Sequence, residues 1–246
     1  MAISEQWTPK ISTFENVPQS ELVTSEEMKE LDRATIEGGV PSLVLMERAA
    51  VSVVDAIKRS AGALLVPVDE ENLDSRDRNP YEVLCVCGMG NNGGDGFATA
   101  RLLHAEGIAA GILFVGEWDK FSIEAGYQAL FAIDQNIPIY DNDLSVIEGR
   151  RVIVDALFGI GLTRDLSGTF LETVEAINRA HDSGATVFAI DIASGLCADT
   201  GQIRGAAVLA DETITIASPK VGMTLGEGPA HSGKIYIADI GIECTS

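Results

Sequence analysis

Apolar residues recur along the chain in two patterns, one at helical spacing and one in short continuous runs. Near the N-terminus, Thr24-Ser25-Glu26-Glu27 forms a capping box, and apolar residues then recur on one side as far as Ile36. This pattern predicts a helix that ends at Gly38-Gly39-Val40-Pro41. Apolar residues at three- and four-residue steps between Leu43 and Ile57 predict a second helix.

From Val83 onward, predicted strands alternate with predicted helices. The strands are Val83–Cys87, Ala109–Val115, Ile137–Tyr140, Arg151–Asp155, Thr186–Asp191, Thr213–Ala217 and Lys234–Asp239. The helices between them are Phe97–His104, Ser122–Ile133 and Gly168–His181. Nearly continuous apolar strands separated by helices predict an α/β fold with a mostly parallel central sheet, covered on both faces and extended by the two N-terminal helices.

The chain shows no internal repeat and no second domain boundary, so residues 22–246 are predicted to form a single domain. Residues 1–21 have no clear period and are predicted to form a loose tail, a candidate for disorder. Residues 66–80 are polar and charged, which predicts an exposed loop before the first strand of the sheet.

The stretch from Val83 to Gly96 concentrates the candidate chemistry. Its apolar run is followed within nine positions by five glycines, by Asn91 and Asn92, and by Asp95. The pattern predicts a buried strand, a tight loop and a helix, with glycines that allow positive φ and close approach of a ligand. The N-terminus of the helix favours an anion or a polar oxygen in that loop.

Two other interpretations of this stretch remain open. Glycine and asparagine are common in ordinary turns between a strand and a helix, so the loop has a purely structural explanation. The spacing Gly88-x-Gly90-x-x-Gly93 also satisfies the dinucleotide fingerprint, with Glu117 near the expected acidic position. Against that fingerprint, the Asp95 carboxylate would repel a phosphate in the same pocket.

Three predicted strands are followed by polar loops that contain Asp95, Asp155 and Asp191. Ligands of parallel α/β sheets bind at the carboxyl ends of the strands, so we expect these acids to share one crevice if the strands are neighbours. A cluster of acids in a crevice requires a cation or a proton held on one member. The alternative is that each aspartate only caps the helix that follows it.

Composition narrows the possible partners. The chain has 246 residues and a net charge of −20, which argues against nucleic acid and against an anionic membrane surface. Its four cysteines, Cys85, Cys87, Cys197 and Cys244, show no metal-binding spacing, and we expect free buried thiols in a reducing compartment, the cytoplasm. No apolar run is long enough to span a membrane, and no signal peptide is evident.

Three blocks of the sequence together resemble a known family. They are Gly88-Met89-Gly90-Asn91-Asn92-Gly93-Gly94-Asp95-Gly96, the block Val154-Asp155-Ala156-Leu157-Phe158-Gly159-Ile160-Gly161-Leu162, and Asp191-Ile192-Ala193-Ser194-Gly195. In this order they resemble the signature blocks of the NAD(P)HX epimerases, the YjeF N-terminal domain family. The resemblance covers about residues 22–243. It implies a Rossmann-like three-layer αβα sandwich, usually a homodimer.

The resemblance also implies an activity. The substrate would be NADHX or NADPHX, the nicotinamide cofactor hydrated at C6, whose R and S epimers the enzyme interconverts. A separate S-specific dehydratase could then repair the whole pool.

The implied roles of individual residues follow the blocks. The residues implied to bind substrate are Asn91, Asn92, Gly93, Gly94, Asp95, Gly159, Ile160, Gly161, Leu162, Thr163, Arg164, Asp165 and Asp191. A potassium ion would be held by Asn92, Asp155 and Ser194. Asp191 is the expected acid/base group, because inverting the hydrated carbon requires a proton to move to or from oxygen.

The sequence departs from the family pattern at Met89 and Ala193, where relatives usually have proline, and at Arg48. For Lys220 two interpretations remain open: its side chain reaches toward the pocket, or it lies at the surface. Two competing functions also remain open at this stage. One is a non-catalytic nucleotide-binding or scaffold module of the same fold, and the other is an NAD-dependent oxidoreductase.

Overall fold

The computed structural model describes residues 8–15, 17–65 and 83–242. The loop predicted over residues 66–80 and Cys244 lie outside the described residues. In this part of the chain the strands are β1 (Lys10–Thr13), β2 (Val83–Cys87), β3 (Ala110–Phe114), β4 (Ile139–Asp141), β5 (Val152–Ala156), β6 (Thr186–Ile190), β7 (Glu212–Ile216) and β8 (Lys234–Asp239). The α-helices are α1 (Ser25–Glu37), α2 (Ser42–Ala61), α3 (Asn91–Ala105), α4 (Ile123–Asp134), α5 (Thr169–Asp182) and α6 (Gly228–Ser232).

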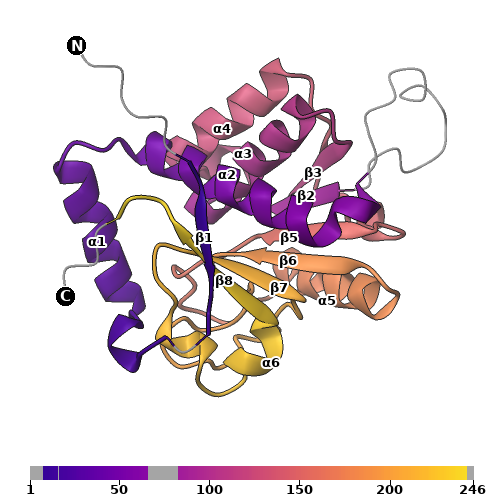
Figure 1. The fold of residues 1–246 in the computed structure, drawn as a ribbon. Helices are drawn as coiled ribbons and strands as arrows, with labels where there is room; N and C mark the ends of the chain where they lie inside the picture. Colours follow the sequence, from indigo (N-terminus) through magenta and orange to yellow (C-terminus); the bar gives the residue numbers. More distant parts are fainter. Residues whose placement is uncertain (1–7, 16, 66–82, 243–246) are drawn as a thin grey trace, which may run out of the picture.

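The strands form one sheet in the order β1-β8-β7-β6-β5-β2-β3-β4, and every pair except β1 with β8 is parallel. Helices α2, α3 and α4 cover one face of the sheet, and α5 covers the other (Figure 1). This is the predicted three-layer αβα sandwich with a mostly parallel sheet and two preceding helices.

The side chains of β2 point alternately to the two faces of the sheet, which shows why both faces are covered. Val83, Cys85 and Cys87 belong to the core under α2 and α3, whereas Leu84 and Val86 belong to the core under α5. All five residues of this strand are buried, as expected for a parallel strand between two helical layers.

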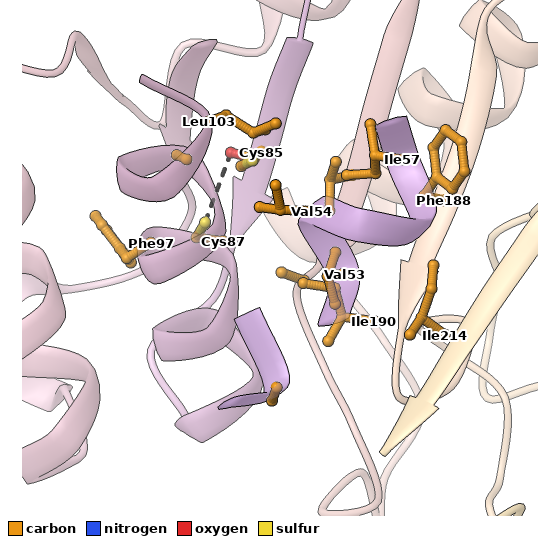
Figure 2. Close-up of a cluster of buried hydrophobic side chains, with 14 of the residues drawn as sticks. Val53, Val54, Ile57, Cys85, Cys87, Phe97, Leu103, Phe188, Ile190 and Ile214 are labelled. Atoms are coloured by element: carbon orange, nitrogen blue, oxygen red, sulfur yellow. Dashed lines mark hydrogen bonds between the residues drawn. The ribbon is translucent and has the colours of Figure 1, made fainter. Parts of the chain in front are cut away.

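The second predicted helix packs directly on the sheet. Figure 2 shows Val53 and Ile57 of α2 beside Ile190 and Phe188 of β6, and Val54 on the side of Cys85 and Cys87 of β2. The helix buries ten of its residues, so it is part of the main core. By contrast, α1 buries only Met28.

The expectation of a loose tail over residues 1–21 fails at β1. Lys10–Thr13 pair in antiparallel register with β8, from Lys10 opposite Asp239 to Thr13 opposite Tyr236. This strand is short and mostly exposed, so it carries no alternating apolar pattern that sequence analysis could detect. Its partner strand supplies the hydrogen bonds that define it. The single domain over residues 22–246 stays a prediction.

Candidate active site

The sheet order brings together the three strand ends that carry the candidate acids. The chain leaves β2 toward β3 and β4 on one side, and then returns to β5 and β6 on the other side of β2. The point between β2 and β5 is therefore a topological switch point, where open α/β sheets bind ligands at the carboxyl ends of their strands. The predicted convergence of these strand ends is confirmed, because β6, β5 and β2 are direct neighbours.

A cavity of about 470 Å³ opens at this edge of the sheet. Its walls come from α1, the start of α2, the start of α3, the loop after β5, the end of β7, and the residues that follow β6 and β8. The polar and charged lining residues are Lys29, Asp32, Ser42, Asn91, Asn92, Asp95 and Asp191. The apolar lining residues include Met28, Leu45, Met46, Met89, Leu157, Ile160, Leu162, Ile216 and Ile240.

Helix α3 begins at Asn91, six residues before the predicted start at Phe97, so the glycine block is helix and not loop. Its glycines serve close packing. A Cβ on Gly93 would lie 1.9 Å from the Gly88 carbonyl oxygen, and one on Gly96 would lie 2.5 Å from the Ala156 Cβ. None of the five glycines of the block has a positive φ, contrary to the conformational role expected of them. They allow the N-terminus of α3 to lie directly on the ends of β2 and β5.

Asn92 lies in the first turn of α3, where both polar atoms of its side chain are buried and make no hydrogen bond to any described residue. Buried polar groups in folded proteins are almost always paired, because leaving one unpaired costs about 1–3 kcal/mol. The Asn92 amide faces Gly159, in the loop after β5. A Cβ built on Gly159 would be 3.4 Å from Asn92 Oδ1 and 3.0 Å from Asp191 Oδ2. Asn92 and Asp191 therefore flank the same backbone position at the cavity.

Asp191 follows β6 with φ = 69°, in the left-handed region that aspartate tolerates better than most residues. Its Oδ1 accepts a hydrogen bond from the Ile216 backbone N–H at 3.3 Å and forms an ion pair with Lys220. Among the described residues these hydrogen bonds fall on Oδ1 alone, which leaves Oδ2 directed toward Gly159 and the cavity.

Lys220 is fully buried, and the surface interpretation of it is wrong. Its ammonium group also donates to Thr215 Oγ1 at 3.0 Å and to the Ile216 carbonyl at 2.9 Å. All three of its donors are used, so it orients Asp191 and holds a positive charge beneath the cavity.

Asp155 and Ser194 bond to each other under the cavity floor. Ser194 donates from its backbone N–H to Asp155 Oδ2 at 2.8 Å and from its hydroxyl to Asp155 Oδ1 at 2.6 Å. The Ser194 hydroxyl oxygen also accepts from the Phe158 backbone N–H at 2.9 Å. Burial raises the pKa of Asp155 to about 6, and the Ser194 and Leu157 hydrogen bonds act in the opposite direction. These bonds tie the end of β5 and the loop after it to the loop after β6.

The cavity gathers carboxyl groups in a partly dry environment. Burial raises the pKa of Asp95 well above its usual range, and the nearby charges of Asp191 and Asp32 raise it further. Burial also raises the pKa of Asp32 to about 6, with Asp191 adding to the effect and Lys220 opposing it. Such groups can hold a proton near neutral pH.

The structure separates the predicted site residues into three sets. Those that line the cavity are Asn91, Asn92, Asp95, Gly159, Ile160, Gly161, Leu162 and Asp191. Gly93, Gly94, Asp155 and Ser194 are buried and do not line it. Thr163, Arg164 and Asp165 are exposed on the continuation of the loop and do not line the cavity. Arg48 also lies outside the lining and donates to the Ile240 carbonyl at 2.9 Å.

Sequence reasoning missed Asp32. A signal for it was present in the sequence, because Asp32 lies four residues after Met28 and four before Ile36, which places it between two apolar residues on one helical face. A carboxylate on such a face indicates either a partner or a site.

Comparison with known proteins shows the family to which the chain belongs. The family described as YjeF-related protein N-terminus matches residues 42–222. The chain belongs to this family. Residues 42–222 include all three of the blocks and most of the cavity wall, whereas α1 lies outside the match.

Relatives extend the likeness over almost the whole chain. A protein of Levilactobacillus brevis named NAD(P)H-hydrate epimerase is 40% identical over 224 residues, covering 91% of this chain and 95% of the relative. One of Lentilactobacillus buchneri with the same name is 41% identical, with coverage of 91% and 95%. The crystal structure of the yeast protein ynu0 superposes with a TM-score of 0.69 at 21% identity over 84% of each chain, which supports the fold.

Proposed function

We propose that this chain is an NAD(P)H-hydrate epimerase, which interconverts the R and S forms of NADHX and NADPHX. The relatives that carry this name match it along nine-tenths of its length. The observation that carries the proposal is that the side chains of Asn92 and Asp191 both face Gly159, in the cavity at the switch point of the sheet. A buried amide without a partner and a carboxylate with one unpaired oxygen form a site for a polar ligand.

Asp191 is the acid/base group of this proposal. The reacting carbon of the substrate bears a hydroxyl group and is bonded to the ring nitrogen, so its inversion requires protons to move to and from oxygen. Oδ1 is held by Lys220 and the Ile216 N–H, which fixes the carboxylate and leaves Oδ2 for that transfer. A positioned carboxylate of this kind contributes roughly 10²–10⁴-fold to a rate.

The remaining lining residues bind and shape the ligand. Asn91, Asn92, Asp95 and the chain from Gly159 to Leu162 contact the substrate in this proposal. Thr163, Arg164 and Asp165 follow this segment and are exposed, and we propose that they contact the outer end of the dinucleotide.

We propose that a potassium ion binds the oxygen atoms near Asn92. No described residue donates to the buried Asn92 Oδ1, and the other two ligands of the proposal are the Ser194 hydroxyl, in the loop after β6, and an Asp155 carboxylate oxygen, at the end of β5. Large monovalent cations prefer several such oxygen dipoles to a dense carboxylate cage. Among the described residues, no group of three or more histidine, cysteine or acidic side chains is arranged for a metal ion. When bound, the cation would supply positive charge that offsets the acids of the cavity.

We further propose that the protein acts in the cytoplasm as a homodimer, ahead of a separate S-specific dehydratase. Within the described ranges, no helix combines the length and the hydrophobicity that crossing a bilayer requires. Neither nucleic acid nor a membrane surface is expected as a partner, in keeping with the net charge of −20.

A coupled assay tests this function. Pure R-NADHX is mixed with an excess of S-specific dehydratase, and NADH formation is followed with and without the protein. We expect wild type to accelerate conversion and Asp191→Asn to lose most of that acceleration. Wild type that leaves R-NADHX unconsumed at high concentration, yet binds it, would instead indicate the non-catalytic binding module. Turnover of plain NADH with a carbonyl substrate would indicate the oxidoreductase.

A further inference from the structure

Helix α1 brings a third carboxylate to the cavity. Met28, Lys29, Asp32 and Ile36 all line it, at spacings that place them on one side of the helix. Asp32 is partly buried there, yet no described residue donates a hydrogen bond to its carboxylate. A half-buried carboxylate without a donor lowers stability, so its position calls for a functional explanation.

The helix is held by hydrogen bonds near its start and has only one buried residue of its own. The Ser25 backbone N–H and hydroxyl donate to the Asp199 carboxylate at 2.6 and 2.8 Å. Just before the helix, the Val23 N–H donates to the Pro219 carbonyl at 3.0 Å, and the Val221 N–H donates to the Val23 carbonyl at 3.0 Å. The chain that enters α1 is therefore bonded to the residues on both sides of Lys220. The same segment that orients Asp191 thus positions Asp32.

The environments of the two carboxylates differ. Asp191 has the Lys220 ammonium group in contact with Oδ1, whereas Asp32 feels that ammonium group only at longer range and lies near Asp191 and Asp95 as well. Lys29, the other charged residue of α1 at the cavity, is exposed and lies 3.9 Å from Glu26. Carboxyl groups whose surroundings differ in this way commonly divide the acid and base roles of a reaction.

We propose that Asp32 is a second catalytic acid/base group of the epimerisation, acting together with Asp191. This inference rests on the proposed epimerase function. In one direction, the acid form of Asp32 gives its proton to the hydroxyl oxygen at the hydrated ring carbon. The carbon–oxygen bond breaks, its electron pair leaves with water, and the nitrogen lone pair forms a carbon–nitrogen double bond.

The second half returns the water to the opposite face of the ring. A new carbon–oxygen bond forms, the double-bond electrons return to nitrogen, and the proton lost by the water passes to the Asp191 carboxylate. In the reverse direction Asp191 is the acid and Asp32 the base, and exchange with solvent restores both protonation states between turnovers. The cationic ring formed midway lies among carboxyl groups, which favours it electrostatically.

Asp32→Asn tests this assignment, with Glu30→Gln as the matched control on the exposed side of the same helix. Epimerisation of R-NADHX and of S-NADHX is measured from pH 5 to 9, together with the melting temperature at pH 7. We expect Asp32→Asn to lower kcat by about 10²–10⁴-fold with KM changed by only a few fold. The wild-type rate should fall as the pH rises past about 6, because the acid form of Asp32 is then lost, and this alkaline limb should be absent from the variant. Glu30→Gln should behave as wild type.

The melting temperature separates a catalytic role from a structural one. Since no residue of the described ranges donates a hydrogen bond to Asp32, Asp32→Asn should be at least as stable as wild type at pH 7. An unchanged kcat and pH profile would overturn the proposal, and so would a lower melting temperature with a proportional loss of active protein. Wild type that fails to epimerise NADHX would overturn the epimerase function itself, which is a separate result.

Discussion

Replacing Lys220 with methionine removes the only cation in contact with the Asp191 carboxylate among the described residues. The Lys220 side chain is 0% exposed and that of Asp191 is 13% exposed, so the charge left behind would remain largely dry. Methionine keeps much of the length of the side chain and deletes its charge. Thr215 Oγ1 and the Ile216 carbonyl would also lose a donor.

The expected loss of stability is large for one substitution. Removing one partner of a buried ion pair costs about 3–5 kcal/mol, because the other charge remains uncompensated. For a chain of this size, each kcal/mol lowers the melting temperature by about 2–4 °C, which gives a fall of about 6–20 °C for Lys220→Met.

Thermal and urea denaturation followed by circular dichroism measure this loss. Lys120→Met is the matched control, because Lys120 pairs with Glu117 at the surface, where the side chains are 56% and 63% exposed. The control should unfold as wild type does, because solvent screens an exposed ion pair. The double variant Lys220→Met/Asp191→Asn should recover part of the loss, because it no longer buries an unpaired charge. A loss below about 1 kcal/mol for Lys220→Met, or no recovery in the double variant, would refute this account of the pair.

Three further predictions concern the packing of Gly96, the buried Asn92 amide and the pH dependence of stability. Gly96→Ala should lower the free energy of unfolding, measured by urea denaturation, by about 1–3 kcal/mol, because its Cβ would lie 2.5 Å from the Ala156 Cβ. The control Gly62→Ala should not lower it, because the space around the added Cβ is open, and equal losses would contradict the packing role of Gly96. Asn92→Leu should raise the free energy of unfolding by about 1–3 kcal/mol in potassium-free buffer and abolish epimerisation, because it replaces a buried amide that lacks a described partner. A variant less stable than wild type would mean that the amide has a structural partner. Burial raises the pKa of Asp32 from 3.8 to about 6, and the charge of Asp191 adds to this effect. Between pH 3.8 and about 6 the folded state therefore binds more protons than the unfolded state, so the free energy of unfolding falls as the pH rises through this range. Wild type should therefore lose more stability than Asp32→Asn between pH 4 and 6.5, and parallel curves would contradict this sign.

Local pattern was enough for most of the elements. The apolar runs that became β2 and β6 are buried on both faces, and they are apolar at nearly every position for that reason. The capping box at Thr24 likewise marks the start of α1, where the Thr24 side chain and Glu27 bond reciprocally. Such features depend only on residues a few positions apart, so one sequence is sufficient to detect them.

The errors occurred where a distant partner decides the local structure. β1 exists because β8 pairs with Lys10–Thr13, and its own residues carry no signal of it. The α3 helix includes Asn91 and the glycines after it because Gly93 and Gly96 pack against Gly88 and Ala156, where local propensity alone predicts a loop.

By itself, the sequence determined the α/β class, the order of the elements, and the three acidic blocks expected to form a site. Only the tertiary structure decided that Lys220 is buried against Asp191, that Asp155 is bonded to Ser194, and that Asp32 joins the cavity from α1. The reason is physical. The type of an element follows from the spacing of neighbouring residues, whereas the environment of a charge depends on which distant segments exclude water from it.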